Sequence, residues 1–258
     1  MNDTTGPFFL FILALLIVFG ISSSSKINLG FRYIGLPPMR REYKDILRSY
    51  CRFYRELSAE KKSEFEKRVQ YFIKSKIFIP RGFDQVTGEM KVLISATAIQ
   101  LTYGFPNVYL KHFKRILIYP DNYYSTINKL YHQGEVNPLN KIIVLSWKSF
   151  MRGMIEDQDG VNLGLHEMAH AIRLENMIRN SEYNFFDQSV LAHWEELARE
   201  EIQKLQSDSL SIFRKYGGTS EEEFFAVAVE NYFERPDLFK QYHPSLFDTL
   251  SKLLNQNV

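Results

Sequence analysis

Cysteine is almost absent from this sequence, because Cys51 is the only one in 258 residues. One thiol cannot form an intramolecular disulfide or a cysteine-based metal cluster, which excludes a disulfide-rich scaffold and a zinc finger. An excess of charge of one sign is also lacking, since 32 Lys and Arg face 30 Asp and Glu and leave a net charge of +2. Without a large cationic surface, nucleic acid is not expected as a partner. The composition, 45% hydrophobic and 24% charged, is typical of a folded globular protein.

Charged residues are missing from one apolar stretch near the N-terminus, residues 7–21. As a helix this stretch covers about 22 Å, and its flanking residues extend it towards the roughly 30 Å of a bilayer core. We expect residues 1–26 to form a single-pass membrane anchor, followed by a linker over residues 27–39 and a domain over residues 40–258. Because Lys and Arg follow the stretch and none precedes it, the positive-inside rule predicts a cytoplasmic domain at the cell membrane. The alternative is a signal peptide that is cleaved on secretion, although the basic residues that usually begin such a peptide are missing.

The remaining pattern predicts helices first, then strands, then helices again. Helical spacing of apolar residues occurs over residues 41–54, 58–73, 87–101, 161–175, 188–206 and 221–233. Two short runs rich in β-branched residues, 115–119 and 141–147, are typical of strands. This layout predicts one α+β domain without internal repeats.

Six histidines are present, and His166 and His170 lie four residues apart in the sequence HEMAH. Residues four apart share one face of a helix, so the two imidazoles can bind a single tetrahedral Zn²⁺. Glu167 lies about 100° around the helix from His166 and can reach a metal-bound water without being a ligand. Apolar neighbours of the motif favour a helix that starts near residues 159–160. The alternative is a pair of surface histidines on an amphipathic helix.

A catalytic zinc takes a third protein ligand and leaves one position for water. Residues 219–233 supply the best candidate, because this segment is apolar on nearly all sides beyond its first turn and must be buried as a helix. Negative charge at Glu221 and Glu222 suits a helix N-terminus, and Thr219 with Glu222 can form a capping box. Glu223 is left to project from the first buried turn, and we predict it to be the third ligand.

Several further segments accompany the motif. HEMAH follows EDQDGVNLGL, EEEFFAVAVENYF comes later, and FIKSKIF, GEMKVLISATAIQL, KRILIYP and VLSW lie upstream. Over these segments, about residues 47–250, the chain resembles the Mlc titration factor A family of zinc metallopeptidases, whose metal site is similar to that of the anthrax lethal factor protease domain. The resemblance implies a zincin-like fold of the gluzincin type, mostly helical with a small mixed sheet, and one Zn²⁺ per chain.

The resemblance also implies the roles of individual residues. The family's metal ligands match His166, His170 and Glu223, and its general base matches Glu167. The family also has a tyrosine seven residues before the ligand glutamate, which matches Tyr216. This phenol would donate a hydrogen bond to the tetrahedral oxyanion. The alternative for Tyr216 is ordinary packing in a loop.

Some positions depart from the family or leave choices open. Arg173 stands where the family commonly has an aspartate, so a carboxylate that orients an imidazole would come from elsewhere, with Glu175 and Glu230 as candidates. His193 is a rival metal ligand, although a histidine at the boundary of an amphipathic helix is the simpler interpretation. We expect residues 141–147 to be the edge strand along which an extended peptide binds.

The leading hypothesis is a membrane-anchored zinc peptidase that acts on a peptide or protein substrate, aminopeptidase-like or with internal cleavage. A second hypothesis is a regulatory binding protein that sequesters a transcriptional regulator or another partner at the membrane, with little peptidase activity. A third is a zinc hydrolase acting on a non-peptide amide. The complete ligand set argues against a degenerate site, because a binding module has no need for Glu167.

Overall fold

The computed structural model describes residues 33, 35–125, 130–205 and 211–257. The expected anchor, residues 1–26, lies outside these residues, as does most of the expected linker. None of the described helices has the length and apolar character needed to cross a bilayer. Met39–Val258 form one compact unit.

The first helices of this unit are α3 (Arg41–Tyr50), α4 (Arg52–Glu56), α5 (Ala59–Ser75) and α6 (Gly88–Leu101). The single helix expected over residues 41–54 is therefore wrong in one respect, since extended backbone at Cys51 divides it into α3 and α4. Helix α6 is buried along most of its length, because α3, α5 and α8 all pack against it.

Four strands form the main sheet, in the order β1 (Ile77–Pro80), β2 (Arg115–Tyr119), β6 (Ile142–Ser146) and β5 (Gly134–Asn137). The first three are parallel and β5 is antiparallel to β6, so the sheet is mixed, as expected. A separate two-stranded sheet consists of β3 (Tyr123–Ser125) and β4 (Leu130–His132).

The strands expected at residues 115–119 and 141–147 are present, but the edge position was assigned to the wrong strand. Strand β6 is internal, between β2 and β5, and β5 is the edge. The four residues of β5, GEVN, include one β-branched residue, which is why the sequence pattern gave no strand there.

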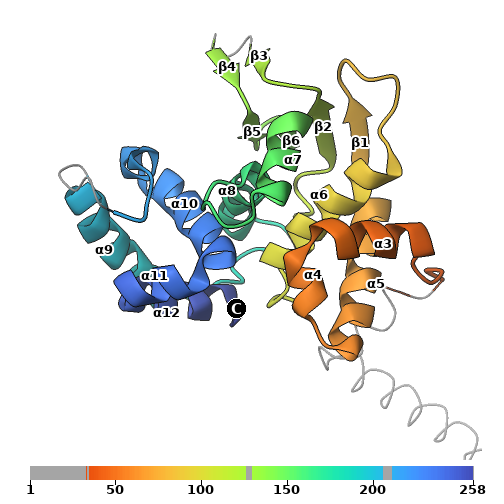
Figure 1. Ribbon diagram of the computed structural model, residues 1–258. Helices are drawn as coiled ribbons and strands as arrows, with labels where there is room; N and C mark the ends of the chain where they lie inside the picture. Colours follow the sequence, from red (N-terminus) through yellow and green to blue (C-terminus); the bar gives the residue numbers. More distant parts are fainter. Residues whose placement is uncertain (1–32, 34, 126–129, 206–210, 258) are drawn as a thin grey trace, which may run out of the picture. The chain divides into compact units, whose positions relative to one another are not determined.

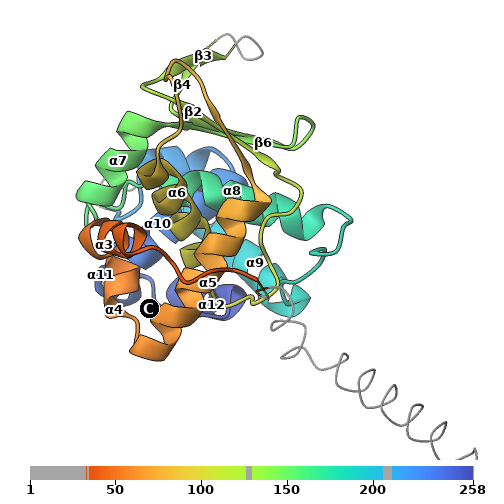
Figure 2. The same ribbon diagram turned by 90° about the vertical axis from the view of Figure 1, so that its right-hand side faces the viewer.

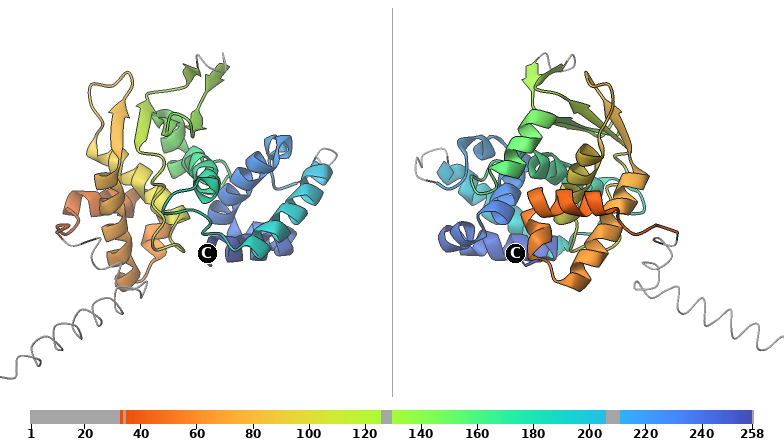
Figure 3. Two further views of the ribbon diagram at one scale, coloured as in Figure 1. Left: turned by 180° about the vertical axis from the view of Figure 1, so that it is seen from behind. Right: turned by 45° about the vertical axis from the view of Figure 1, so that its right-hand side comes forward.

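The remaining elements are α7 (Trp147–Ile155), α8 (Leu163–Met177), α9 (Gln188–Leu205), the 3-10 helix η1 (Lys215–Thr219), α10 (Glu221–Glu234), α11 (Pro236–Tyr242) and α12 (Pro244–Leu254). Helix α8 lies below β5 and β6 in Figure 1 and below β6 in Figure 2, and it also packs against α10. Figure 3 shows α9 to α12 on one side of α8 and α3 to α5 on the other. The helix that carries HEMAH is thus enclosed by the sheet and by helices from both ends of the domain.

Candidate metal centre and active site

Helix α8 begins at a buried asparagine. The Asn162 side chain accepts a hydrogen bond from the amide of Leu165 at 3.0 Å, which caps the helix. Its amide group also donates to the carbonyl of Gly153 at 3.0 Å and to Glu234 Oε1 at 2.9 Å. The expected start at residues 159–160 is therefore a few residues too early. Gly160 instead has φ +76°, in the turn that precedes the helix.

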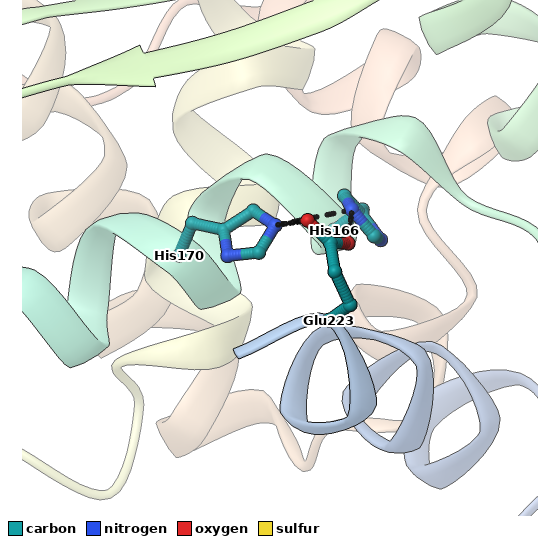
Figure 4. A group of neighbouring side chains, drawn as sticks. All are labelled: His166, His170 and Glu223. Atoms are coloured by element: carbon teal, nitrogen blue, oxygen red, sulfur yellow. Dashed lines mark hydrogen bonds and ion pairs between the residues drawn. The ribbon is translucent and has the colours of Figure 1, made fainter. Parts of the chain in front are cut away.

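Helix α10 begins at Ser220, whose hydroxyl accepts from the amide of Glu223 at 3.2 Å. The capping box predicted for Thr219 and Glu222 is wrong, because the Thr219 hydroxyl donates instead to the carbonyl of Tyr216 at 2.7 Å. The first turn that results carries Glu223 towards α8 (Figure 4).

Three predicted ligands meet between the two helices (Figure 4). The Nε2 atoms of His166 and His170 lie 3.1 Å apart. Glu223 Oε2 lies 3.1 Å from Nε2 of His166, and Glu223 Oε1 lies 3.5 Å from Nε2 of His170. Across the described part of the chain, this is the one group of three or more His, Cys, Asp or Glu side chains arranged to hold a metal ion.

The donor atoms fit a divalent metal. Nδ1 of His166 donates to Glu230 Oε1 at 2.8 Å, so Nε2 can turn its lone pair towards the other ligands. Glu223 Oε2 is buried and faces Nε2 of His166 at 3.1 Å, but no described residue makes a well-aligned hydrogen bond to it. Two imidazole nitrogens on a tetrahedral zinc lie about 3.3 Å apart, close to the spacing of His166 and His170.

Electrostatics also favour a cation at this point. Burial by itself would lower the pKa of His166, but hydrogen bonds to Glu223 and Glu230 outweigh it and raise the pKa to about 10. Burial opposes ionisation of Glu223, yet the two imidazoles hold its pKa well below the usual range. Both shifts show that the carboxylates of Glu223 and Glu230 favour positive charge at the two imidazoles, and a divalent metal ion would supply such charge.

Glu167 is next to the ligands but is not one of them. Its side chain is buried, and burial raises its pKa to about 7 against the opposing effect of His166 and His170. The carboxylate lies against the edge strand, since a Cβ placed on Gly134 would be 2.3 Å from Glu167 Oε1. A carboxyl with a pKa near neutrality is suited to accept and return a proton.

A cleft of about 460 Å³ gives access to the centre. Its lining joins the edge strand to the ligand helices and includes Gly134, His166, Glu167, Arg214, Tyr216 and Glu230. Tyr216 is about half exposed, and its ring centroid lies 6.1 Å from that of His166. Burial and the charge of Glu223 raise the pKa of this phenol, so it remains a proton donor at neutral pH.

Other candidates lie elsewhere. His193 is exposed and pairs with Glu196 at 3.6 Å, so it is not part of the ligand group. Glu175 is buried but accepts from the backbone amide of His112, whereas Glu230 contacts a ligand imidazole. Arg173, at the position of the family's aspartate, lies 3.4 Å from Glu195.

Two residues of the cleft escaped the sequence interpretation. Gly134 belongs to a strand that no pattern predicted. Arg214 precedes η1 and donates to Glu230 Oε2 at 2.5 Å. Its role depends on a partner 16 residues away, which a local pattern does not reveal.

The chain matches the family model described as "Glucose-regulated metallo-peptidase M90" over residues 32–254. It is 25% identical over 230 residues to an uncharacterized protein of Synechocystis sp., covering 83% of this chain and 84% of that protein. It is 29% identical over 223 residues to Mlc titration factor A of Escherichia fergusonii, covering 78% of this chain and 81% of that protein. The Cronobacter sakazakii protein of the same name is 28% identical over the same coverage.

Proposed function

The chain belongs to the glucose-regulated metallopeptidase M90 family, whose model matches residues 32–254, and from this premise we propose that it is a zinc-dependent peptidase that hydrolyses peptide bonds. The observation that carries the proposal is the convergence of His166, His170 and Glu223, together with a cleft that is lined by His166 and by the buried Glu167. Two imidazoles and one carboxylate are a ligand set of catalytic zinc sites.

The residues of the cleft divide the hydrolysis of an amide between them. His166, His170 and Glu223 would hold a zinc ion, which would supply Lewis acidity towards the carbonyl oxygen and would lower the pKa of the attacking water. Glu167 takes the proton of the attacking water and delivers it to the leaving nitrogen. Tyr216 donates a hydrogen bond to the oxyanion as it develops, an interaction that is strongest in the transition state.

The edge strand suits a peptide substrate. Strand β5 pairs with β6 on one side, and within the described sheet its other side has no neighbouring strand. Gly134 and Gln133 at its start line the cleft beside Glu167. An extended peptide can therefore add to β5 through main-chain hydrogen bonds and bring a scissile carbonyl to the centre. Strand β5 takes the docking role that the sequence assigned to residues 141–147.

Location forms a separate part of the proposal. The apolar residues 7–21 anchor the protein in the cell membrane and leave the peptidase domain in the cytoplasm, as the distribution of Lys and Arg favours. A reporter fused after Val258 tests this, because activity of a cytoplasmic reporter is expected. Activity of an exported reporter, with loss of the N-terminal segment, would instead support secretion.

Regulatory binding is the second candidate function. Relatives in the comparison carry the name Mlc titration factor A, which favours a regulatory protein as partner. Glu167 distinguishes the two functions, since sequestration needs no general base. A Glu167→Gln variant that restores the wild-type phenotype to a deletion strain would support binding. Failure of this variant to complement the deletion would support hydrolysis.

Metal analysis and a peptide-library digest test the main proposal together. Full-length protein purified in detergent should contain one zinc per chain and cleave a subset of peptides, and the cleavage sites will show whether it removes terminal residues. Glu167→Gln should retain the zinc and lose about 10²- to 10⁴-fold in kcat/KM, the usual contribution of a general base. Folded protein without zinc, or a variant with unchanged turnover, would contradict the proposal.

A further inference from the structure

Glu230 is a carboxylate in the interior of the protein, with 1% of its surface exposed. It lies on α10 seven residues after Glu223, which is two turns along the same helix face. Both of its oxygens are engaged: Oε1 accepts from Nδ1 of His166 at 2.8 Å, and Oε2 accepts from Nη2 of Arg214 at 2.5 Å. One side chain thus connects a metal-binding imidazole to a guanidinium.

A buried carboxylate is stable only when charged partners and hydrogen bonds satisfy it. Arg214 meets this need from outside α8 and α10, because it immediately precedes η1. The Nε atom of Arg214 is buried and has no hydrogen-bond acceptor among the described residues, which leaves Glu230 as the anchor of this guanidinium there. Two residues further on, Tyr216 lies beside the ring of His166.

Other buried carboxylates near α8 bind backbone amides and asparagine side chains rather than a histidine of the HEMAH motif. Glu234 accepts from the amide of Gly160 and from Asn162, so it holds the turn before α8. Glu175 accepts from the amide of His112 and from Asn180, so it holds two loops. Among the described carboxylates, Glu230 is the one joined by its two oxygens to a metal-ligand histidine and to an arginine.

We propose that Arg214 and Glu230 form a positioning pair, which fixes the imidazole of His166 for metal binding and ties the segment carrying Tyr216 to the same centre. The inference rests on the proposed zinc peptidase function and extends it to residues that do not touch the metal. Loss of a hydrogen-bond partner behind a ligand histidine typically weakens metal binding 10- to 100-fold.

The test compares zinc affinity of full-length variants by competition with a chromogenic chelator, with Co²⁺ absorption as a second readout. Arg214→Met and Glu230→Gln should each raise the Kd for zinc about 10- to 100-fold and change the Co²⁺ spectrum. Arg214→Lys, which keeps the charge without the planar fork, should recover part of the affinity. Arg199→Met is the matched control. Arg199 lies on α9 and pairs at 3.5 Å with Glu221, which is on α10 like Glu230 but does not contact a predicted metal ligand. The Kd of this control variant should equal that of the wild type.

A second measurement separates positioning from general loss of stability. In a double-mutant cycle on kcat/KM, Tyr216→Phe should cost less in the Arg214→Met background than in the wild type, since the tyrosine segment is then no longer held. Additive effects would overturn the link to Tyr216.

The inference and the function on which it rests can fail separately. Wild-type protein that folds but binds no zinc would contradict the peptidase proposal. Wild-type protein that binds zinc, with equal affinity in the isosteric Glu230→Gln variant, would contradict the positioning pair alone. This second comparison remains decisive if Arg214→Met does not fold.

Discussion

Gly134 lies in direct contact with Glu167: a Cβ on the glycine would be 2.3 Å from one carboxylate oxygen and 2.5 Å from the carboxyl carbon. The glycine belongs to the edge strand β5, and the glutamate belongs to α8, the helix that carries His166 and His170. The absence of a side chain at residue 134 therefore allows the edge strand and Glu167 to line one cleft.

If Glu167 is the general base of a zinc peptidase, Gly134→Ala should abolish peptidase activity and leave zinc binding intact. The added methyl group must displace the Glu167 carboxylate, which then no longer reaches the attacking water, so we expect kcat/KM to fall about 10²-fold or more. Zinc content and the melting temperature measured beside it report whether the centre is intact.

Gly218→Ala provides the control for this substitution. Its Cβ would meet Cβ of Leu205 at 3.6 Å, an ordinary packing distance, so activity should stay within a few-fold of wild type. Full activity of Gly134→Ala would show that Glu167 does not need its present position.

Tyr216→Phe removes a hydroxyl and leaves the ring. If the phenol stabilises the oxyanion, kcat should fall about 10²-fold, with little change in KM or in zinc content. Tyr242→Phe is a suitable control, because Tyr242 is exposed to a similar degree, 60% against 52%, but does not line the cleft. A variant of Tyr216 that loses affinity rather than kcat would indicate a substrate contact instead.

Removal of the metal should destabilise the domain. His166 and His170 on α8 and Glu223 on α10 share the centre, so zinc at about 1,000 times its Kd adds about 4 kcal/mol to the free energy of unfolding. Chelation should lower the melting temperature of the wild type but not that of His170→Ala.

The rival ligand can be tested in the same titration. His193→Ala should keep the full response to zinc, since its exposed imidazole pairs with Glu196. Loss of that response would return His193 to the ligand set.

The HEMAH helix and the Glu223 helix were predictable because their signals are local. Two histidines four residues apart converge through helical geometry alone. A helix that is apolar on nearly all sides must be buried, which leaves its charged first turn at the edge of the core. Glu230 could be proposed as a partner of an imidazole for the same reason, since seven residues separate it from Glu223 on one helix face.

Contacts between distant segments decided what the sequence missed. Several polar residues precede α8, and Asn162 becomes the cap because it also donates to Glu234, 72 residues away. The edge strand β5 has no strand pattern of its own, and its place follows from pairing with β6. Similarly, the extended backbone at Cys51 ends α3, but no Pro or Gly stands there to predict the end of a helix from the sequence.

Glu234 should make stability depend on pH. Burial raises its pKa to about 7, although hydrogen bonds from Asn162 and from the amide of Gly160 oppose the shift. An unfolded glutamate has a pKa near 4.5, so between these values the folded state holds more protons than the unfolded state. The contribution of Glu234 to the free energy of unfolding is therefore fully present below about pH 4.5 and is lost as the pH rises through about 7. The free energy of unfolding changes by about 3 kcal/mol over this range.

Urea unfolding of wild type and Glu234→Gln across pH 4.5 to 8 measures this effect, because the variant has no proton to exchange at that position. The free-energy difference between the two proteins should move by about 3 kcal/mol across this range, in the direction that favours the wild type at low pH. Glu196→Gln, at an exposed position on α9, should run parallel to the wild type. Parallel curves for Glu234→Gln as well would mean that the buried carboxylate stays ionised, with Asn162 and Gly160 sufficient to hold its charge next to the metal-binding helix.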